Sequence, residues 1–254
     1  MTRQTTFVLL TTQRSGSGWL VDLLDDHPSI TAYEELFRVT DTTVPRRGAT
    51  RVPRFEVMVG PSTFSTSAGL MARRHRYVRG LARAHPESRV VGFKLMYDQT
   101  RNHPGLVPTL ALMRARFIHL VRHDSLSAIV SFDIAHAEDR WHYHAGEWVQ
   151  PPKIWADTAR LLTRLEERDD EIERFRRLLS RLPVPVHEVA YEDLLARRDD
   201  VLGALSDFLG VPAPPRTLRS KVVPTVPGRT VDLVQNRDAV RAALAGTEYE
   251  WLAA

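Results

Sequence analysis

A turn rich in glycine and serine near the N-terminus is the first stretch whose residue types could do chemistry. It reads RSGSGW, runs from Arg14 to Trp19, and directly follows the apolar run FVLLTT at 7–12. A turn of this kind between a strand and a helix directs backbone N–H groups and the positive end of the helix dipole at one point. Its two glycines let the backbone curl around an anion, and its two serine hydroxyls can add donors. The stretch therefore predicts a phosphate-binding loop.

The loop differs from that of a nucleotide-hydrolysing enzyme. Such a loop reads GxxxxGK[ST], with the lysine on the β- and γ-phosphates and the hydroxyl on Mg²⁺, and neither the lysine nor its spacing is present here. Arg14 can still hold a phosphate, in a bidentate manner. A kinase acting on a small molecule is therefore an alternative that the loop itself disfavours.

A second candidate site lies in the stretch FIHLVRHDSLSAIVSF at 117–132. Arg122 falls at the end of an apolar run, and Ser131 follows nine residues later along the next predicted helix. Asp124 or Ser125 can cap that helix. An arginine at the carboxyl end of a strand, together with a serine on the following helix, could bind another phosphate at the ligand-binding edge of a sheet.

Lys94 is a third candidate because of where it lies. The chain has only three lysines, and this one falls inside the apolar run VVGFKLM at 90–96. A lysine in such a place is costly unless it is paired with an opposite charge. Either Lys94 is paired, or its side chain snorkels to solvent at the end of the strand.

The elements that must position these residues alternate along the chain. Strands are predicted at 7–12, 90–96, 117–121 and 184–191, all as runs buried on both faces. Helices are predicted between and after them, at 17–26, 105–115, 124–137, 152–180, 192–209 and 237–246. This alternation predicts an α/β fold: a P-loop-like parallel β-sheet of four or five strands flanked by helices.

The composition is that of an ordinary globular protein, with 254 residues, 43% hydrophobic and 26% charged. The length fits one domain, 1–254, and the lack of cysteine excludes disulfides, thiolate metal sites and cysteine nucleophiles. No apolar run approaches the roughly 20 residues needed to cross a bilayer, and no signal-peptide pattern is present. We therefore expect a cytoplasmic protein.

The segment 38–88 interrupts the alternation of strands and helices. Eleven arginines against three carboxylates between Arg38 and Arg89 give a local balance of +8, although the whole chain carries only +4. The segment holds too few apolar residues for a core of its own, so we interpret it as an insertion. Nucleic-acid binding by this basic segment is a second alternative function, but no aromatic-basic interleaving or nucleic-acid motif accompanies it.

Five motifs in one order resemble those of sulfotransferases that use 3′-phosphoadenosine-5′-phosphosulfate (PAPS). They are TQRSGSGWL, HPSITAYEELF, GFKLMYDQ, LVRHDSLSAIVSF and YEDLLARRDDVLGALSDFLGVP, and they span about 7–36 and 90–212. The likeness is to bacterial members, including the trehalose type, and to tyrosylprotein sulfotransferases. In many members the arginine and serine of the fourth motif are eight residues apart, whereas here they are nine apart, as in the trehalose type.

The resemblance implies that PAPS is the donor and that a hydroxyl is the acceptor, with no metal. The loop would hold the 5′-phosphosulfate, Arg122 and Ser131 the 3′-phosphate, and the insertion would form a lid on the acceptor side. A C-terminal RKGxxG motif found in cytosolic members is absent, so Lys221 or Arg219 would supply a comparable charge. The implied donor-binding residues are Arg14, Ser15, Gly16, Ser17, Gly18, Trp19, Arg122, Ser131, Tyr191 and Lys221.

The resemblance also implies a general base, because a hydroxyl is a poor nucleophile at neutral pH. In the family a glutamate shortly after the HP dipeptide takes this role, and here AYEELF offers Glu34 and Glu35, of which the family pattern favours Glu35. Lys94, with Arg14, would offset the charge that develops on the leaving oxygen. The acceptor itself stays open among sugars, lipids, peptide tyrosines and specialised metabolites, as does the oligomeric state.

Three histidines, in the stretch AHAEDRWHYH, have a spacing loosely like that of a metal site. No carboxylate pattern such as HExxH accompanies His136, His142 and His144. We therefore expect them in the acceptor pocket or at the surface.

Overall fold

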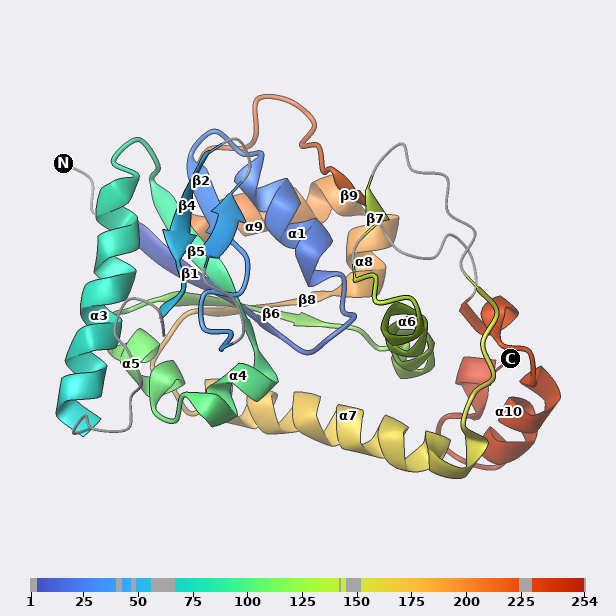
Figure 1. Cartoon of the computed structure of the whole chain (residues 1–254). Coiled ribbons are helices and arrows are strands. Elements are labelled where there is room, and N and C mark those ends of the chain that lie inside the picture. Colours follow the sequence, from blue (N-terminus) through green and yellow to red (C-terminus); the bar gives the residue numbers. More distant parts are fainter. Residues whose placement is uncertain are drawn as a thin grey trace.

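The computed structural model describes residues 4–39, 43–46, 49–55, 67–141, 143–144, 152–223 and 230–253. A parallel sheet of five strands in the order β2-β5-β1-β6-β8 forms its centre (Figure 1). The strands are β1 (Thr5–Thr11), β2 (Ile30–Tyr33), β5 (Val90–Met96), β6 (Arg116–Val121) and β8 (Val186–Ala190). The predicted α/β fold with a parallel sheet is confirmed.

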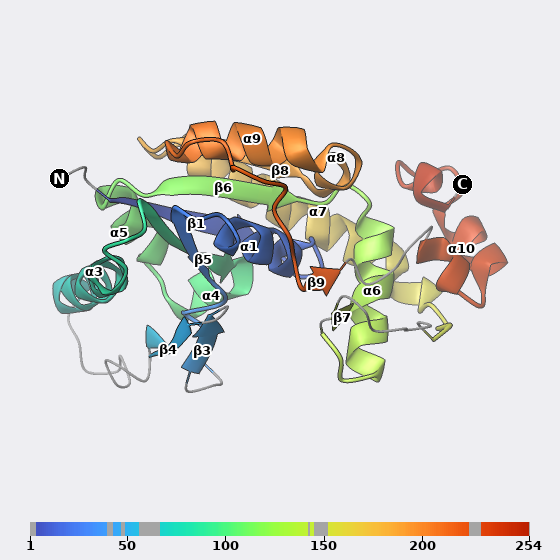
Figure 2. The same ribbon diagram turned by 90° about the horizontal axis from the view of Figure 1, so that it is seen from above.

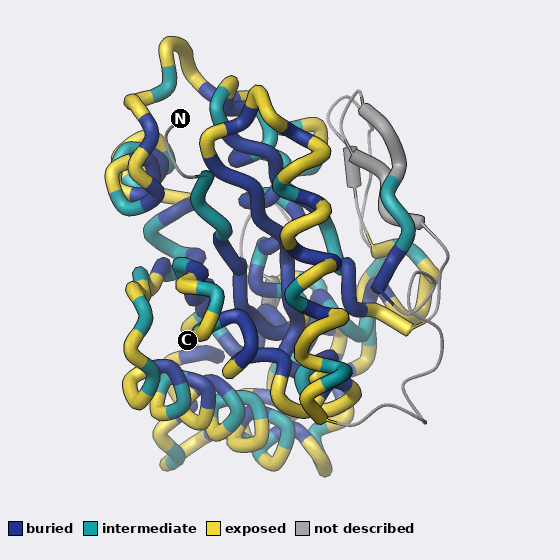
Figure 3. Tube along the Cα trace, turned by 90° about the vertical axis from the view of Figure 1, so that its left-hand side faces the viewer, coloured by how far each residue is buried: buried dark blue, intermediate teal, exposed yellow. Residues whose placement is uncertain are grey.

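Helices cover both faces of this sheet because its central strands are apolar on both sides. On β1, Phe7 and Leu9 point to one face, where α1 (Ser17–Asp25) and α9 (Arg198–Leu209) pack. Val8 and Leu10 point to the other face, against α3 (Ser67–Ala84), α5 (Leu106–Leu112) and the second half of α7 (Thr158–Ser180). Figures 2 and 3 show the resulting layers and the buried strands between helices with exposed outer surfaces.

A third apolar cluster lies beyond the sheet and joins the C-terminal residues to the body of the molecule. It contains α6 (Ser125–Ala137), the first half of α7, the 3₁₀ turns Thr230–Leu233 and Glu250–Ala253, and α10 (Arg237–Leu244). Asn236, which is buried, exchanges two hydrogen bonds of 2.9 Å with the backbone of Ala156. These bonds hold α10 against the start of α7.

Several boundaries differ from the predictions for physical reasons. The helix expected at 152–180 begins only at Thr158, because the Asp157 side chain accepts the Ala159 N–H at 3.2 Å and caps it. The strand at 184–191 is not buried on both faces, since β8 lies at the sheet edge and Val186 is 39% exposed. The helix expected at 192–209 is divided into α8 (Tyr191–Ala196) and α9. The strand β2 and the short helix α4 (Tyr97–Asn102) were not predicted.

The insertion packs onto the sheet rather than standing apart. It contains the antiparallel hairpin of β3 (Thr43–Arg46) and β4 (Ala49–Pro53), followed by α3, whose Val78 and Leu81 belong to the main core. The Tyr77 hydroxyl donates to the Pro53 carbonyl at 2.8 Å, which ties α3 to the hairpin. Within the described part of the chain, no helix combines the length and apolar character of a membrane span.

Candidate active site

The sequence-predicted residues converge at the carboxyl edge of the parallel sheet, where strand ends expose backbone and side chains. The glycine-serine loop follows β1, the glutamate pair follows β2, and Lys94 lies near the end of β5. Arg122 follows β6, and Tyr191 follows β8. Five strands thus deliver residues far apart in sequence to one edge.

The loop after β1 depends on glycine at position 16. Gly16 has φ 79° and is the N-cap residue of α1, and a Cβ atom there would lie 2.4 Å from the ring of Tyr191. The Tyr191 ring is buried beneath the loop, and the Arg122 guanidinium lies 4.7 Å from its centre. The Tyr191 ring therefore packs against the loop at Gly16 and makes a cation–π contact with the Arg122 guanidinium.

Arg14 stands between the two residues predicted to bind a second phosphate. Its Nε donates to Ser131 Oγ at 2.9 Å, and its Nη1 donates to the Trp141 carbonyl at 2.7 Å. Arg122 Nη1 donates to the Arg14 carbonyl at 3.2 Å, while its buried Nε has no hydrogen-bond partner among the described residues. The structure therefore brings the loop, Arg122 and Ser131 together.

A third arginine, Arg168 of α7, reaches the loop and was not predicted. It donates to the Gln13 carbonyl at 3.0 Å and to Ser15 Oγ at 3.1 Å, while Ser15 gives its own proton to the Thr12 carbonyl at 3.0 Å. Burial and the nearby Arg122 lower the pKa of Arg168 to about 10, so it stays charged at neutral pH. Its Nε is buried and has no partner within the described ranges.

A signal for Arg168 was present in the sequence. The buried residues of α7 recur at 161, 165, 172, 175 and 179, and position 168 falls on the same stripe between Leu165 and Ile172. An arginine on an apolar stripe requires a polar partner in the interior. The rest of α7 is so rich in charge that the sequence pattern alone does not separate this arginine from the solvated face.

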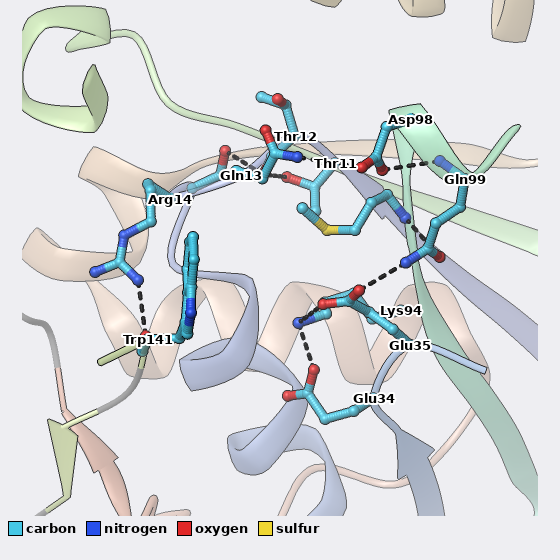
Figure 4. A network of polar contacts seen from close by, with 12 residues as sticks. Thr11, Thr12, Gln13, Arg14, Glu34, Glu35, Lys94, Asp98, Gln99 and Trp141 are labelled. Carbon is cyan, nitrogen blue, oxygen red and sulfur yellow. Dashed lines mark hydrogen bonds and ion pairs between the residues drawn. The ribbon is translucent and has the colours of Figure 1, made fainter. Parts of the chain in front are cut away.

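Lys94 has the carboxylate partners that its buried position requires. Its Nζ contacts the carboxylate of Glu34 and lies 3.1 Å from Glu35 Oε1 (Figure 4). The Lys94 side chain is 4% exposed, against 33% for Glu34 and 21% for Glu35. Parallel pairing of β2 with β5 sets Tyr33 opposite Phe93, which places the residues that follow side by side.

This pairing keeps Glu35 ionised. Burial alone would raise the pKa of Glu35, but the Lys94 ammonium, helped by Arg38 and Arg54, moves that pKa below its ordinary value. Burial would likewise lower the pKa of Lys94, and the two carboxylates reverse this and raise it. A carboxylate that is ionised at neutral pH and 21% exposed can accept a proton from a bound hydroxyl.

Two further polar residues, Asp98 and Gln99 of α4, were not singled out from the sequence. Gln99 Nε2 donates to Glu35 Oε2 at 2.6 Å, and Asp98 Oδ2 accepts from Gln13 Nε2 at 3.3 Å (Figure 4). They follow β5 directly, which was the available signal, because polar residues just after a parallel strand lie at the ligand-binding edge.

The remaining donor-site predictions lie around α1. Gly18 is buried in its first turn, and Ser17 begins it. Trp19 lines a hollow of about 420 Å³ together with residues 195–200 of α8 and α9. Lys221 is exposed, and its backbone N–H donates to the Asp22 carboxylate of α1.

A larger hollow, of about 670 Å³, opens between α4, α6 and α7 beside the loop. Charged side chains of both signs line it, together with an apolar patch from α6. They are Asp98, Arg101, Arg164, Glu167, Arg168, Asp170, Glu171 and Arg174, with Ala128, Ile129 and Phe132 forming the patch.

The histidine stretch is only partly described. His136 is exposed and stacks on Phe132 with ring centres 6.3 Å apart. His142 lies outside the described residues, and of His144 only the backbone, in the short strand β7 (Tyr143–His144), is described.

Similarity to known proteins identifies the family. Residues 7–215 match the model of a family described as the sulfotransferase family. Nodulation protein H of Rhizobium tropici is 25% identical over 207 residues, which cover 82% of this chain and 76% of that protein.

Two solved structures share the fold. The sulfotransferase from Alicyclobacillus acidocaldarius superimposes with a TM-score of 0.51 at 16% identity, covering 96% of this chain and 92% of that one. A sulfotransferase domain from the curacin biosynthetic pathway gives a TM-score of 0.50 at 17% identity, covering 99% and 90%.

Proposed function

Since the chain belongs to the sulfotransferase family, we propose that it transfers a sulfuryl group from PAPS to a hydroxyl, which yields a sulfate ester and 3′-phosphoadenosine-5′-phosphate (PAP). One observation supports this above the others. An anion-binding loop, arginines with unsatisfied buried N–H groups, and a glutamate held ionised by a buried lysine meet at one edge of the sheet.

The loop residues Arg14 to Trp19 bind the 5′-phosphosulfate in this proposal. The N–H groups at the start of α1 and the positive end of its dipole favour an anion there. The site fits such a donor, because the buried Nε atoms of Arg168 beside the loop and of Arg122 at the proposed 3′-phosphate position have no hydrogen-bond partner in the described chain. Unsatisfied buried donors are costly, and a phosphate oxygen would satisfy them.

The 3′-phosphate of the donor binds at Arg122 and Ser131, on the side of the loop where Tyr191 holds the guanidinium. The hollow beside Trp19 is the proposed place of the adenosine, since an indole offers a face on which a base can stack. Lys221, whose backbone is fixed to α1, completes the positive charge around the nucleotide.

Glu35 is the proposed general base. As the acceptor oxygen forms its bond to sulfur, Glu35 takes the hydroxyl proton, and the bond between sulfur and the bridging oxygen breaks. The electron pair of that bond stays on the phosphate of PAP, where Arg14 and Lys94 offset the new charge. Transfer in one displacement relies on positioning and electrostatics, as phosphoryl transfer does.

The hollow between α4, α6 and α7 is the proposed approach of the acceptor. Its charged lining favours a polar acceptor, and the apolar patch from α6 can pack against the carbon skeleton of a small molecule, carbohydrate or lipid head group. The insertion 38–88 is proposed as a lid on the acceptor side, because Arg54 and Phe55, after its hairpin, are buried beside the segment that follows β2 and contains Glu35.

Isothermal titration calorimetry with PAP tests the donor assignment, with ATP as the comparison ligand. PAP should bind clearly more tightly than ATP, and no PAP binding would overturn the proposal. Glu35→Gln should abolish turnover of PAPS and keep PAP affinity, whereas Glu34→Gln should retain most of the turnover. Mass spectrometry of extracts incubated with enzyme and PAPS would then identify the acceptor as a product heavier by one SO₃ group.

A further inference from the structure

The helix α4 links the glycine-serine loop after β1, the proposed donor loop, to the pair Glu34 and Glu35. Two of its polar residues, Asp98 and Gln99, reach in opposite directions and touch each other, since the Gln99 N–H donates to Asp98 Oδ1 at 2.8 Å. Gln99 reaches Glu35, and Asp98 reaches Gln13 (Figure 4). The result is a continuous chain of hydrogen bonds from the loop after β1 to the carboxylate after β2.

We propose that Gln99 is a positioning residue that fixes the carboxylate of Glu35, and that Asp98 couples this orientation to the donor loop through Gln13. The proposal rests on the proposed function, because it assigns a role relative to Glu35 as the base. Neither residue carries a role through the family resemblance described above.

A glutamate side chain does not by itself hold its carboxylate in one orientation. The last torsion of glutamate is broad, so an isolated carboxylate rotates readily. Here one oxygen faces Lys94 at 3.1 Å and the other faces Gln99 at 2.6 Å, so the plane of the Glu35 carboxylate is set by donors from two different elements. An ionised carboxylate has about four lone-pair sites, and those that remain can accept the proton of an acceptor hydroxyl.

Gln99 is itself held firmly. It is 4% exposed, and its Oε1 accepts the Met96 N–H at 3.4 Å, which orients its NH₂ group toward Glu35. Gln99 is therefore able to impose an orientation on its neighbour rather than to follow it.

The start of α4 is anchored in the core, and this anchor fixes the position of the whole hydrogen-bond chain. Tyr97, the residue before Asp98, stacks on Phe175 with ring centres 4.0 Å apart and planes 9° apart. Its hydroxyl bonds His119, whose other ring nitrogen lies 3.0 Å from Glu188. This packing fixes the two polar residues of α4 relative to the sheet.

The charge around Glu35 predicts how its pKa responds to a change at Gln99. Groups from four elements face it or lie near it: Lys94, Glu34, Arg38, Arg54 and, through Gln99, Asp98. A hydrogen bond donated to the ionised carboxylate lowers its pKa. Removing that donor should raise the pKa of Glu35, and placing a second carboxylate there should raise it further.

Two substitutions test this. Gln99→Met keeps a long side chain and removes the amide, and Gln99→Glu is nearly isosteric and keeps an acceptor for the Met96 N–H while opposing Glu35. The pKa of Glu35 can be followed in the full chain by carboxyl ¹³C resonances, assigned with Glu35→Gln. We expect it to rise in the order wild type, Gln99→Met, Gln99→Glu. Thr100→Val on the same helix, which removes only a bond to the Tyr97 carbonyl, should leave it unchanged.

Turnover gives the second measurement, taken as PAP released from PAPS with water as acceptor. Gln99→Met should lower kcat by about 10–100-fold, as a misplaced catalytic group does, and leave the Kd for PAP within about 2-fold. The acid limb of its pH–rate profile should move to higher pH. Gln13→Ala, at an exposed side chain, should slow the wild type but add nothing to Gln99→Met, because both act through one chain.

The proposal is overturned if the pKa of Glu35 is the same in wild type, Gln99→Met, Gln99→Glu and Thr100→Val. It is also overturned if Gln99→Met loses PAP affinity in proportion to turnover, or if the effects of Gln13→Ala and Gln99→Met on turnover add. Should Gln99→Met fail to fold, the nearly isosteric Gln99→Glu still decides the order of pKa values. The titration requires no sulfuryl transfer, so a chain that shows the expected order but does not bind PAP would refute the proposed function and leave this geometry standing.

Discussion

Replacing Lys94 by methionine should reverse the way the stability of this protein depends on pH. In the wild type the pKa of Glu35 is lowered, so Glu35 contributes stability that is present above its ordinary pKa and lost as the pH falls through the lowered value. Without Lys94, burial and the neighbouring Glu34 both raise the pKa of Glu35. The variant should then be most stable below the ordinary pKa and lose stability as the pH rises through the raised value.

The size of the effect follows from the burial of the three groups. Removing one partner of a buried ion pair costs about 3–5 kcal/mol. Because Glu34 is 33% and Glu35 21% exposed, water can solvate part of the remaining charge, and we expect the lower end, about 3 kcal/mol at pH 8. In a chain of this length that corresponds to a fall in Tm of about 6–12 °C. At pH 5 the fall should be clearly smaller.

Thermal unfolding followed by circular dichroism at pH 5 and pH 8 measures this directly. Lys153→Met is the matched control, because Lys153 is exposed, and it should change stability by no more than about 0.5 kcal/mol at either pH. Adding Glu35→Gln to Lys94→Met should restore part of the loss at pH 8. Equal destabilisation at the two pH values, with no recovery in the double variant, would refute the electrostatic reasoning.

Three further outcomes follow from the geometry. Arg122→Ala should weaken PAP binding by about 10–100-fold in calorimetry, the equivalent of one or two charge-assisted hydrogen bonds, and leave Tm nearly unchanged; an unaltered Kd would contradict its assignment. Gly16→Ala should abolish PAP binding and lower Tm, because φ is 79° and the new Cβ would overlap the ring of Tyr191; near-normal binding would show that the loop has another conformation. Asn236→Ala should cost about 2–3 kcal/mol of unfolding free energy in denaturant titrations, through two lost buried bonds to Ala156, and a loss near zero would mean that water replaces them.

The local parts of the site were predictable from the sequence, and the long-range parts were not. The loop at Gly16 and the position of Arg122 depend on strand, turn and helix signals within a few residues of each other. The need of Lys94 for a partner also followed from its apolar surroundings. Arg168 was missed because its role depends on where α7 crosses the loop, and no pattern within a helix states which element it will meet.

The fold shows the same division. The long apolar run 90–96 was predicted at its true bounds, because continuous hydrophobic strands are typical of a parallel sheet. The strand β2 has only four residues, Ile30–Tyr33, and is recognisable only by its pairing with β5. Gln99 lies just past a predicted strand, yet its importance depends on Glu35, which β2 places beside it.

The helix α7 connects the main core to the C-terminal apolar cluster. Its second half is fixed by Phe175 in the main core, its first half by Leu165 in the C-terminal cluster, and Arg168 touches the donor loop between them. Trimming the polypeptide to residues 7–215, the part that matches the family, would strip the cover from the first half of α7 and release Arg168 from the loop. We therefore expect residues 230–253 to support the proposed nucleotide site through α7, and expression plasmids should keep them.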